Sequence, residues 1–302
     1  MKRILITGTN SYLGNAIEQY LMEYNSNQGR EIYRVDKISL REEVWKKASF
    51  AEYDTILHVA GIAHADIGNV SKETQELYYQ INCGLTLEVA EKAKAEGVPQ
   101  FVYFSSVIVY GDGGGFGKEK VITADTKPQP ANFYGDSKWQ AELGLSKLGD
   151  DKFKVAVLRL PMIYGKGSKG NFPLLVKIAK KLPVFPKINN RRSMLYVENL
   201  AEFVRLLTEC GRDGIFFPQN AEYVTTAEMV KSIGQACGKN VRIIGMLNPL
   251  VTLASHMPGK ISGMVDKAFG SLIIDKELSL RDIQDYRIFS LEKSIGKSVT
   301  KD

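Results

Sequence analysis

A tyrosine and a lysine four residues apart, Tyr134 and Lys138, form the pair in this chain best suited to proton transfer. If their segment is a helix, the two side chains share one face. A nearby ammonium stabilises a phenolate, so Lys138 is expected to lower the pKa of Tyr134, which in a free tyrosine is about 10. Ser105 and Ser106 follow an apolar run and could hold a substrate oxygen beside the phenol. This combination predicts proton transfer at an alcohol or ketone, which also needs a hydride carrier.

The N-terminal residues have the pattern of a binding site for that carrier. Residues 4–6 are a short apolar run, typical of a strand buried on both faces, and residues 16–22 have helical apolar spacing. The turn between them contains Gly8 and Gly14. A strand, a glycine turn and a helix bind a dinucleotide pyrophosphate at the helix N-terminus. Asp36 closes the next apolar run, near the position expected for the residue that binds the adenosine ribose.

Composition limits the class of protein. The 302 residues are 44% hydrophobic, which allows a large core in one big domain or two unequal ones. The net charge of +6 suits an anionic ligand such as a nucleotide, and no basic stripe indicates nucleic-acid binding. Three scattered cysteines and three histidines without metal-ligand spacing predict a reduced, cytoplasmic protein with no metal site. We see no signal peptide, and the apolar segment 246–258 is too short to span a membrane.

Alternating elements predict an α/β fold with a Rossmann-type, doubly wound parallel sheet. We expect residues 1–160 to form an NAD(P)-binding Rossmann domain. Residues 161–302 should be mainly a smaller C-terminal α/β lobe that binds substrate over the carboxyl edge of the sheet, with a return strand near 214–218 joining the first domain. The expected strands lie at residues 4–7, 32–35, 55–60, 101–105 and 155–160.

Four further segments carry specific expectations. A long helix is predicted over residues 77–96, and another over 171–181. Thr225 and Glu228 are spaced as a capping box that opens a helix ending at Gly238. The glycine-rich stretch 111–117 is either a mobile flap over a site or a solvated turn.

Taken together, the motifs resemble the extended short-chain dehydrogenase/reductase family, of the NAD-dependent epimerase/dehydratase type that modifies nucleotide sugars. The resemblance covers residues 1–210 well and the remainder more loosely. The motifs, in chain order, are Thr7-Gly8 with Gly14, His58-Val59-Ala60-Gly61, Asn82, Ser106 to Gly111, Tyr134 with Lys138, and Arg159-x-Pro161-x-x-Tyr164-Gly165.

The resemblance implies a cofactor site and a catalytic triad. NAD is the implied cofactor because Asp36 would repel a 2′-phosphate, whereas Arg34 and Lys37 keep NADP as the alternative. Lys138 would bind the nicotinamide ribose, Tyr134 would move the hydroxyl proton, and Ser106 would hydrogen-bond the same oxygen. The implied cofactor contacts are Gly8, Ser11, Tyr12, Leu13 and Gly14 at the pyrophosphate, Asp36 at the ribose, and Ala60, Gly61 and Asn82 farther along.

A UDP-sugar is the implied substrate. Asn171 and Phe172 match a helix start that contacts the diphosphate, Phe185 falls where an aromatic ring meets the uracil, and Arg192 matches an arginine that pairs with the diphosphate. Each has a structural alternative: Asn171 as a helix N-cap, Phe185 in the core, and Arg192 on a solvated turn. The family further implies a homodimer through helices near residues 77–96 and 134–148.

Departures from the family pattern narrow the activity. Ser11 replaces the middle glycine of the turn, and its side chain would crowd the pyrophosphate. The acidic pair of the 4,6-dehydratases is here Val107-Ile108, which supplies neither acid nor base, so dehydratase is excluded. Met162 stands where galactose-type epimerases carry Asn. Residues 159–165, 189–193 and 269–272 resemble the branch from bacterial O-antigen and capsule clusters, which acts at C4 of UDP-N-acetylhexosamines or their 4-keto-6-deoxy forms.

Two activities fit the same three residues. One is a UDP-sugar 4-epimerase with a retained NAD. The other is a 4-keto reductase of a UDP-4-keto-6-deoxy-hexosamine that consumes an exchangeable NAD(P)H. A non-catalytic NAD-binding regulator is disfavoured because Ser106, Tyr134 and Lys138 are all intact.

Overall fold

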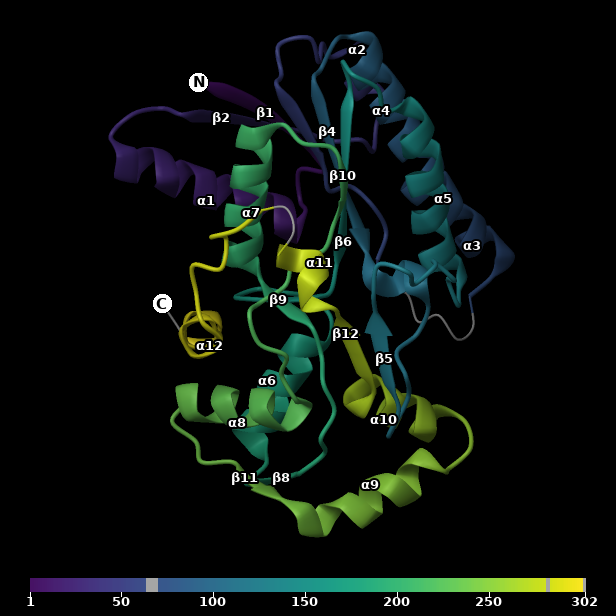
Figure 1. Ribbon diagram of the computed structural model, residues 1–302, viewed down its shortest axis with the longest axis vertical. Helices are drawn as coiled ribbons and strands as arrows, with labels where there is room; N and C mark the ends of the chain where they lie inside the picture. The colour runs from purple at the N-terminus through teal and green to yellow at the C-terminus, as the bar shows by residue number, and fades with distance from the viewer. Residues whose placement is uncertain (64–69, 281–282, 301–302) are drawn as a thin grey trace.

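A six-stranded parallel sheet forms the centre of the first domain in the computed structural model, which describes residues 1–63, 70–280 and 283–300 (Figure 1). The strand order is β10-β6-β4-β3-β1-β2, and every pairing is parallel. This confirms the predicted α/β fold. The strands are β1 (Lys2–Thr7), β2 (Tyr33–Ile38), β3 (Thr55–His58), β4 (Gln100–Ser106), β6 (Lys154–Leu160) and β10 (Gly214–Phe216).

The sheet has β2 as its edge strand. In the common Rossmann order 3-2-1-4-5-6, a third strand lies outside the second. Here residues 39–54 separate β2 from β3 and contain one short helix, α2 (Val44–Lys47). The chain therefore crosses directly from β2 to the other side of β1. The strand order reverses between β1 and β3, and ligands of open α/β sheets bind at such a reversal.

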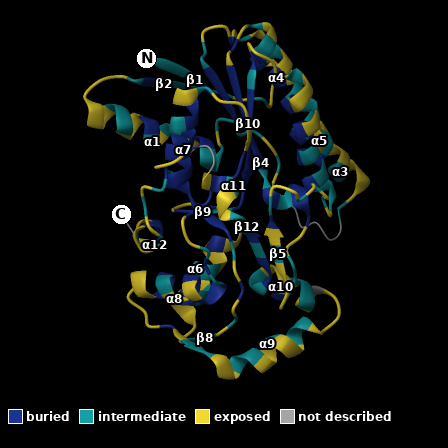
Figure 2. Cartoon of the chain, in the orientation of Figure 1, coloured by how far each residue is buried: buried dark blue, intermediate teal, exposed yellow. Residues whose placement is uncertain are grey.

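Helices cover both faces of this sheet. On one face lie α1 (Tyr12–Gln28) and α7 (Val197–Cys210), and on the other α4 (Leu85–Ala95) and α5 (Phe133–Leu148) (Figure 1). Strand side chains alternate between the faces. Ile4 and Ile6 accordingly pack in the cluster with α1 and α7, whereas Leu5 packs in the cluster with α4 and α5. The buried strands form the darkest part of Figure 2.

The helix predicted over residues 77–96 is interrupted. It consists of α3 (Lys72–Tyr79), a π-helical turn η1 (Gln80–Gly84) and α4. Such turns insert a residue into an α-helix and often occur at functional sites. The inserted turn contains Asn82, which is fully buried. Hydrophobic periodicity does not reveal the turn because apolar residues continue on both sides of it.

The second lobe contains three small parallel strand pairs: β5 (Glu119–Ile122) with β12 (Ser271–Ile274), β7 (Met162–Tyr164) with β9 (Met194–Tyr196), and β8 (Val184–Pro186) with β11 (Arg242–Ile244). Its helices are α6 (Asn171–Lys181), α8 (Thr226–Ala236), α9 (Asn248–Ser255), α10 (Lys260–Phe269), α11 (Lys276–Leu280) and α12 (Leu291–Val299). The short 3-10 turns are η2 (Val107–Tyr110) and η3 (Gly245–Leu247). Helix α6 has the predicted bounds, and the capping box is present: Glu228 N donates to Thr225 Oγ1 at 2.9 Å, and Thr225 N donates to Glu228 Oε2 at 2.8 Å.

Segments from each half of the chain cross into the other. Strand β5 precedes residue 160 but pairs with β12 of the second lobe, while α7 and β10 return to the central sheet. Within the described part of the chain, no helix has the length and apolar character needed to cross a bilayer.

Candidate active site

Ser106, Tyr134 and Lys138 lie where β4 ends and α5 begins. Ser106 is the last residue of β4, and Tyr134 and Lys138 occupy the first two turns of α5. The Nζ atom of Lys138 donates to the carbonyl oxygen of Phe104 at 3.1 Å. This contact fixes the reactive face of α5 against the carboxyl end of β4. The structure thus brings together the elements that carry the three predicted catalytic residues.

A glycine allows this close approach. A Cβ atom on Gly135 would lie 2.8 Å from the Ile108 carbonyl oxygen and 3.2 Å from the Cβ of Pro130. The first distance is shorter than real Cβ atoms tolerate, so a larger residue here would push α5 away from η2. Asn132 caps the helix, and its side-chain oxygen accepts from Gly135 N at 3.0 Å. Gly135, the residue after Tyr134, therefore sets how near the start of α5 lies to η2.

Asn82 joins three elements around the site. Its Oδ1 accepts from Ile62 N at 2.8 Å, and its Nδ2 donates to Ile62 O and to Ser137 Oγ, each at 3.1 Å. Ser137 Oγ in turn donates to Tyr134 O at 2.9 Å. Both amide protons of Asn82 are thus used within the protein. In this structure Asn82 holds the loop after β3 against α5, which is a positioning role that motif matching did not indicate.

Burial determines the protonation of the Tyr134 and Lys138 pair. Burial, followed by the charge of Tyr78, raises the pKa of Tyr134 to about 12. Burial lowers the pKa of Lys138 to about 8, against a smaller upward effect of Glu142. The Tyr134 shift is opposite to the one that the spacing predicts, because desolvation disfavours the phenolate and the ammonium is directed at the Phe104 carbonyl. At neutral pH, Tyr134 is a proton donor in this arrangement.

The buried side chain of His58 connects two elements next to the site. His58 Nδ1 lies 2.9 Å from Thr7 Oγ1, and His58 Nε2 lies 3.0 Å from Thr86 Oγ1. Thr86 uses its single hydroxyl proton on Asn82 O, so it must accept from Nε2–H, and Nδ1 accepts from Thr7. Burial, then the charge of Lys138, lowers the pKa of His58 to about 3. A neutral His58 therefore links β1 to the turn that holds Asn82.

A buried ion pair clamps β4, α5 and β6 together. Arg159 donates from Nη2 and Nε to Glu142 Oε2, at 2.6 and 3.0 Å. Ser105 Oγ donates to Glu142 Oε1, and Arg159 Nη1 donates to the Tyr110 hydroxyl. Arg159 and Glu142 are each about 4% exposed, so the pair is fully withdrawn from water. Ser105 thus serves this clamp, whereas Ser106 Oγ, at the end of β4, donates to Leu160 O at 3.4 Å and accepts from Ile108 N at 3.3 Å.

The turn after β1 has the shape that a dinucleotide needs. Gly8 has φ of 99° and approaches Ala60 so closely that an added Cβ would lie 3.4 Å from its Cα. A Cβ on Gly14 would lie 2.9 Å from the Ile6 side chain. The backbone from residue 8 to 14 therefore lines the edge between β1 and β3, with the α1 N-terminus facing it. Ser11 is the N-cap, and its Oγ accepts from Gly14 N at 3.3 Å.

The predicted cofactor contacts Tyr12, Leu13 and Gly61 lie near this edge, and each has a different environment. Tyr12 has a buried hydroxyl with no hydrogen-bond partner among the described residues. It packs at Gly165 and Gly167 of the second lobe, and Leu13 packs between the two hydrophobic clusters. An added Cβ on Gly61 would lie 3.0 Å from Asn82 Oδ1 and 3.2 Å from Lys138 Nζ, so this backbone passes directly over both side chains.

Asp36 lies within β2, two residues before the end of the strand. Strand β2 continues through Lys37 and Ile38, which pair with Ile6 and Thr7, so Asp36 lies opposite Leu5. The charge of Asp36 contributes, after burial, to raising the pKa of Tyr53. The apolar run ends before Asp36, but the hydrogen-bonded strand does not, and only the pairing register reveals this.

The predicted substrate contacts lie in the second lobe in contrasting environments. Asn171 is the exposed first residue of α6, whose N-cap is Gly170. Phe172 is buried against Tyr164 with ring centroids 5.4 Å apart, and Phe185 is buried against Phe269 at 5.8 Å. Arg192 donates from Nε to Gly270 O at 3.0 Å and from Nη2 to Lys267 O. In this structure the Arg192 guanidinium therefore binds the carboxyl end of α10.

The glycine-rich stretch 111–117 is attached to the second lobe. Gly114 N donates to Ser271 O at 3.1 Å, and Phe116 N donates to Asp266 Oδ1 at 2.7 Å. A Cβ on Gly114 would lie 2.5 Å from the Lys118 carbonyl oxygen, so the turn requires glycine there. Asp112, Gly113 and Gly117 are exposed, as the solvated-turn alternative expects, and the stretch also connects η2, next to Ser106, with α10 and β12.

Comparison with known proteins identifies the family. The model of the NAD dependent epimerase/dehydratase family matches residues 4–216. The chain belongs to this family. It is therefore an enzyme of the extended short-chain dehydrogenase/reductase type, and the cofactor of the family is NAD. The match confirms the resemblance drawn from the motifs at Gly8, Ser106, Tyr134 and Lys138.

Two relatives that match most of the chain are named as sugar 4-epimerases. The UDP-glucose 4-epimerase of Vibrio cholerae is 26% identical over 293 residues, covering 91% of this chain and 87% of the relative. The N-acetyl-alpha-D-glucosaminyl-diphospho-ditrans,octacis-undecaprenol 4-epimerase of Escherichia coli O157:H7 is 25% identical over 281 residues, covering 88% and 82%. The crystal structure of UDP-glucuronic acid 4-epimerase from Bacillus cereus in complex with NAD matches with a TM-score of 0.72 at 16% identity, covering 98% and 97%, which establishes a shared fold.

Proposed function

We propose that this family member is a nucleotide-sugar epimerase that acts at C4 of a UDP-hexose or UDP-N-acetylhexosamine. The observation that supports the proposal is the contact of Lys138 with the Phe104 carbonyl, which joins the start of α5, where Tyr134 lies, to the strand that ends at Ser106. Similarity to two sugar 4-epimerases over nearly the whole chain supports the same chemistry.

The residues fit the cofactor of the family. The backbone at Gly8, Gly14, Ala60 and Gly61 would hold a dinucleotide along the edge between β1 and β3, in a turn whose close packing on Ile6 leaves no room for a side chain at Gly14. NAD, when bound there, supplies a reversible hydride acceptor. Lys138 would contribute the positive charge beside the nicotinamide ribose.

The chain's own side chains would handle the proton. Ser106 would donate a hydrogen bond to the sugar oxygen at C4, and Tyr134 would exchange a proton with that oxygen. Because burial raises the pKa of Tyr134 to about 12, its phenol is suited to protonating a 4-keto oxygen. That step occurs in the second half of an epimerisation and also in the 4-keto reductase, which remains the second candidate activity.

Incubation of the purified enzyme with UDP-GlcNAc or UDP-glucose tests this proposal. The epimerase should give an equilibrium mixture of C4 epimers by NMR with no net consumption of cofactor, and mass spectrometry should find NAD released from the denatured protein. Stoichiometric loss of NADPH with a 4-keto substrate would instead identify the reductase.

The sugar carrier is a separate question. One relative is named for a sugar on a polyprenol diphosphate. We propose this carrier as the second candidate, because residues 152–197 contain no Asp or Glu and would accept a diphosphate from either. Parallel assays with UDP-GlcNAc and with detergent-solubilised GlcNAc-diphospho-undecaprenol would separate the two. In both assays Arg192→Ala should raise KM if Arg192 binds diphosphate, and leave it unchanged if the arginine only caps α10.

The oligomeric state is also a proposal. Leu77 on α3 and Leu143 on α5 are large apolar residues that are 43% and 38% exposed. We propose that the two helices form a homodimer interface. Light scattering should give twice the monomer mass, and Leu143→Glu should halve it.

A further inference from the structure

The far end of the second lobe carries an apolar ridge, here defined as Met246, Leu250, Leu253 and Met257 on and around α9 with Ile261 and Met264 on α10. Met246 is 88% exposed, Leu253 66%, and Leu250 and Met264 63% each. Helix α9 lies along the outer edge of the lobe and is largely exposed (Figures 1 and 2). Monomeric soluble proteins rarely leave so many large apolar side chains together in water.

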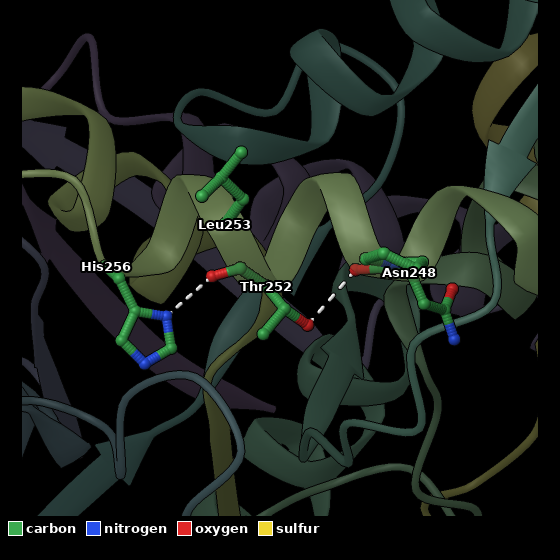
Figure 3. A pocket seen from close by; sticks show the side chains of 5 residues that line it. Asn248, Thr252, Leu253 and His256 are labelled. Carbon is green, nitrogen blue, oxygen red and sulfur yellow. Dashed lines mark hydrogen bonds between the residues drawn. The ribbon is translucent and has the colours of Figure 1, made fainter.

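The ridge follows helical geometry. Leu250 and Leu253 lie on one face of α9, Met246 lies in the preceding turn η3, and Met257 follows the end of the helix. Helix α9 contains no charged residue at all. Two polar side chains of this segment bond to its own backbone: Thr252 Oγ1 donates to Asn248 O at 3.1 Å, and His256 Nδ1 donates to Thr252 O at 2.7 Å. Figure 3 shows Leu253 projecting from the helix away from Thr252 and His256.

Positive charge lies beside the ridge where β8 and β11 pair, whereas α10 carries the exposed Asp266 two residues after Met264. Residues 229–265 contain four Lys or Arg and no Asp or Glu, and residues 161–197 contain eight and none. The two stretches meet in space, because β11 pairs with β8 and Asn248 Nδ2 donates to Lys187 O at 2.7 Å. Acidic and basic residues are mixed along the whole sequence, but the outer end of the second lobe is basic. Its exposed cations next to α9 include Lys181, Lys187, Lys239 and Arg242.

We infer that this end of the lobe docks onto an anionic lipid bilayer, with the ridge inserted among the lipid chains and the surrounding cations on the headgroups. An exposed apolar helix face bordered by Lys and Arg is the arrangement of proteins that lie on membrane interfaces. The charge argues against a second copy as the occupant, since two such faces would bring like charges together. The inference does not depend on which sugar the enzyme converts.

The docking end is connected to the active site. Helix α10 ends at the carbonyls of Lys267 and Gly270, which accept from Arg192, and Asp266 on the same helix holds Phe116 of the loop after η2. That loop follows Ser106 by a few residues. A bilayer at the ridge would therefore lie against the elements that border the predicted substrate side of the site.

Co-sedimentation of the full chain with vesicles tests the inference. Vesicles of phosphatidylcholine with 30% phosphatidylglycerol, at about 0.1 M salt, should carry down the wild-type protein, and neutral phosphatidylcholine vesicles should carry down much less. Leu253→Glu should lower the partition coefficient at least tenfold. Val44→Glu is the matched control, because Val44 is also 66% exposed but lies on the first domain, and it should leave binding unchanged.

A second pair of variants tests the charge. Lys239→Glu with Arg242→Glu should lower binding to anionic vesicles at least tenfold, whereas Arg30→Glu with Lys152→Glu, on the first domain, should change it less than threefold. Thermal unfolding monitors the fold of each variant. Absence of wild-type binding, or equal losses in ridge and control variants, overturns the inference. Light scattering could also overturn it. If the wild-type protein is a dimer that does not bind vesicles, and Leu253→Glu makes it a monomer, then the ridge is an interface between copies of the chain.

Discussion

Asp36 lies opposite Leu5 in the parallel pairing of β1 with β2, two residues short of Ile38, whose carbonyl accepts from Gly8 N at 2.8 Å. At about 3.3 Å per strand residue, its backbone is about 7 Å from the end of the strand. The adenosine ribose of a dinucleotide binds outside that end. The residues at the end are Ile38 and Ser39, and the Asp36 side chain is 38% exposed, with Arg34 Nε 4.0 Å from its Oδ2.

Asp36→Asn decides between two positions of the carboxylate: NAD affinity should fall about tenfold if Asp36 binds the ribose, and by less than threefold if it is set back from it. The substitution removes the charge but keeps the shape. Binding is measured by calorimetry on protein freed of nucleotide. Gly8→Val is the reference variant, because φ of 99° and contact with Ala60 exclude a branched side chain, and it should abolish binding. A tenfold loss of NAD affinity in Asp36→Asn would show that Asp36 binds the ribose.

Tyr134→Phe should lower kcat by about 10² to 10⁴, the range for loss of a general acid or base, while NAD affinity stays within threefold. The ring keeps its packing against Tyr78, whose centroid lies 6.0 Å away, so the helix start should persist. Tyr79→Phe is the control: it removes a hydroxyl that donates to Asp136 at 2.7 Å and should cost less than tenfold. Unchanged turnover in Tyr134→Phe would discard the mechanism.

The pH profile of kcat/KM should fall on its alkaline side near pH 8. Burial lowers the pKa of Lys138 to about 8, so the ammonium is present below that pH and lost above it. One pH unit above the pKa, about a tenth of the lysines remain charged, and kcat/KM should drop to about a tenth. The measurement is an initial-rate series from pH 6 to 10 at constant ionic strength. A profile that stays level to pH 10 would show that Lys138 keeps its proton.

Glu142→Ala should lower the free energy of unfolding by about 3–5 kcal/mol, because it leaves the Arg159 guanidinium charged and unpaired in the interior. The exposed pair Glu119 with Arg191, joined at 2.6 and 2.7 Å, is the matched control. Glu119→Ala should cost less than about 1 kcal/mol, since water screens surface pairs. Urea unfolding of both variants measures the difference, and equal losses would contradict the role given to burial.

The sequence by itself determined the local elements and the residue types of the site. Apolar runs marked the strands, the helix at residues 171–181 had its observed bounds, and Thr225 with Glu228 marked a helix start. The spacing of Tyr134 and Lys138 placed both on one face of α5. These features depend on residues close together in the chain. Their periodicity and capping residues can therefore be read from short stretches of sequence.

The tertiary structure alone decided the features that depend on distant segments. Pairing register extended β2 two residues past Asp36, and the π-helical turn placed Asn82 against Ile62 and Ser137. Burial, which the whole fold creates, reversed the expected pKa shift of Tyr134. Strand β5 pairs with β12 about 150 residues later in the chain, and the basic stretches of the second lobe gather only because β8 pairs with β11. Register, desolvation and surface charge arise from contacts between segments, and no local pattern encodes them.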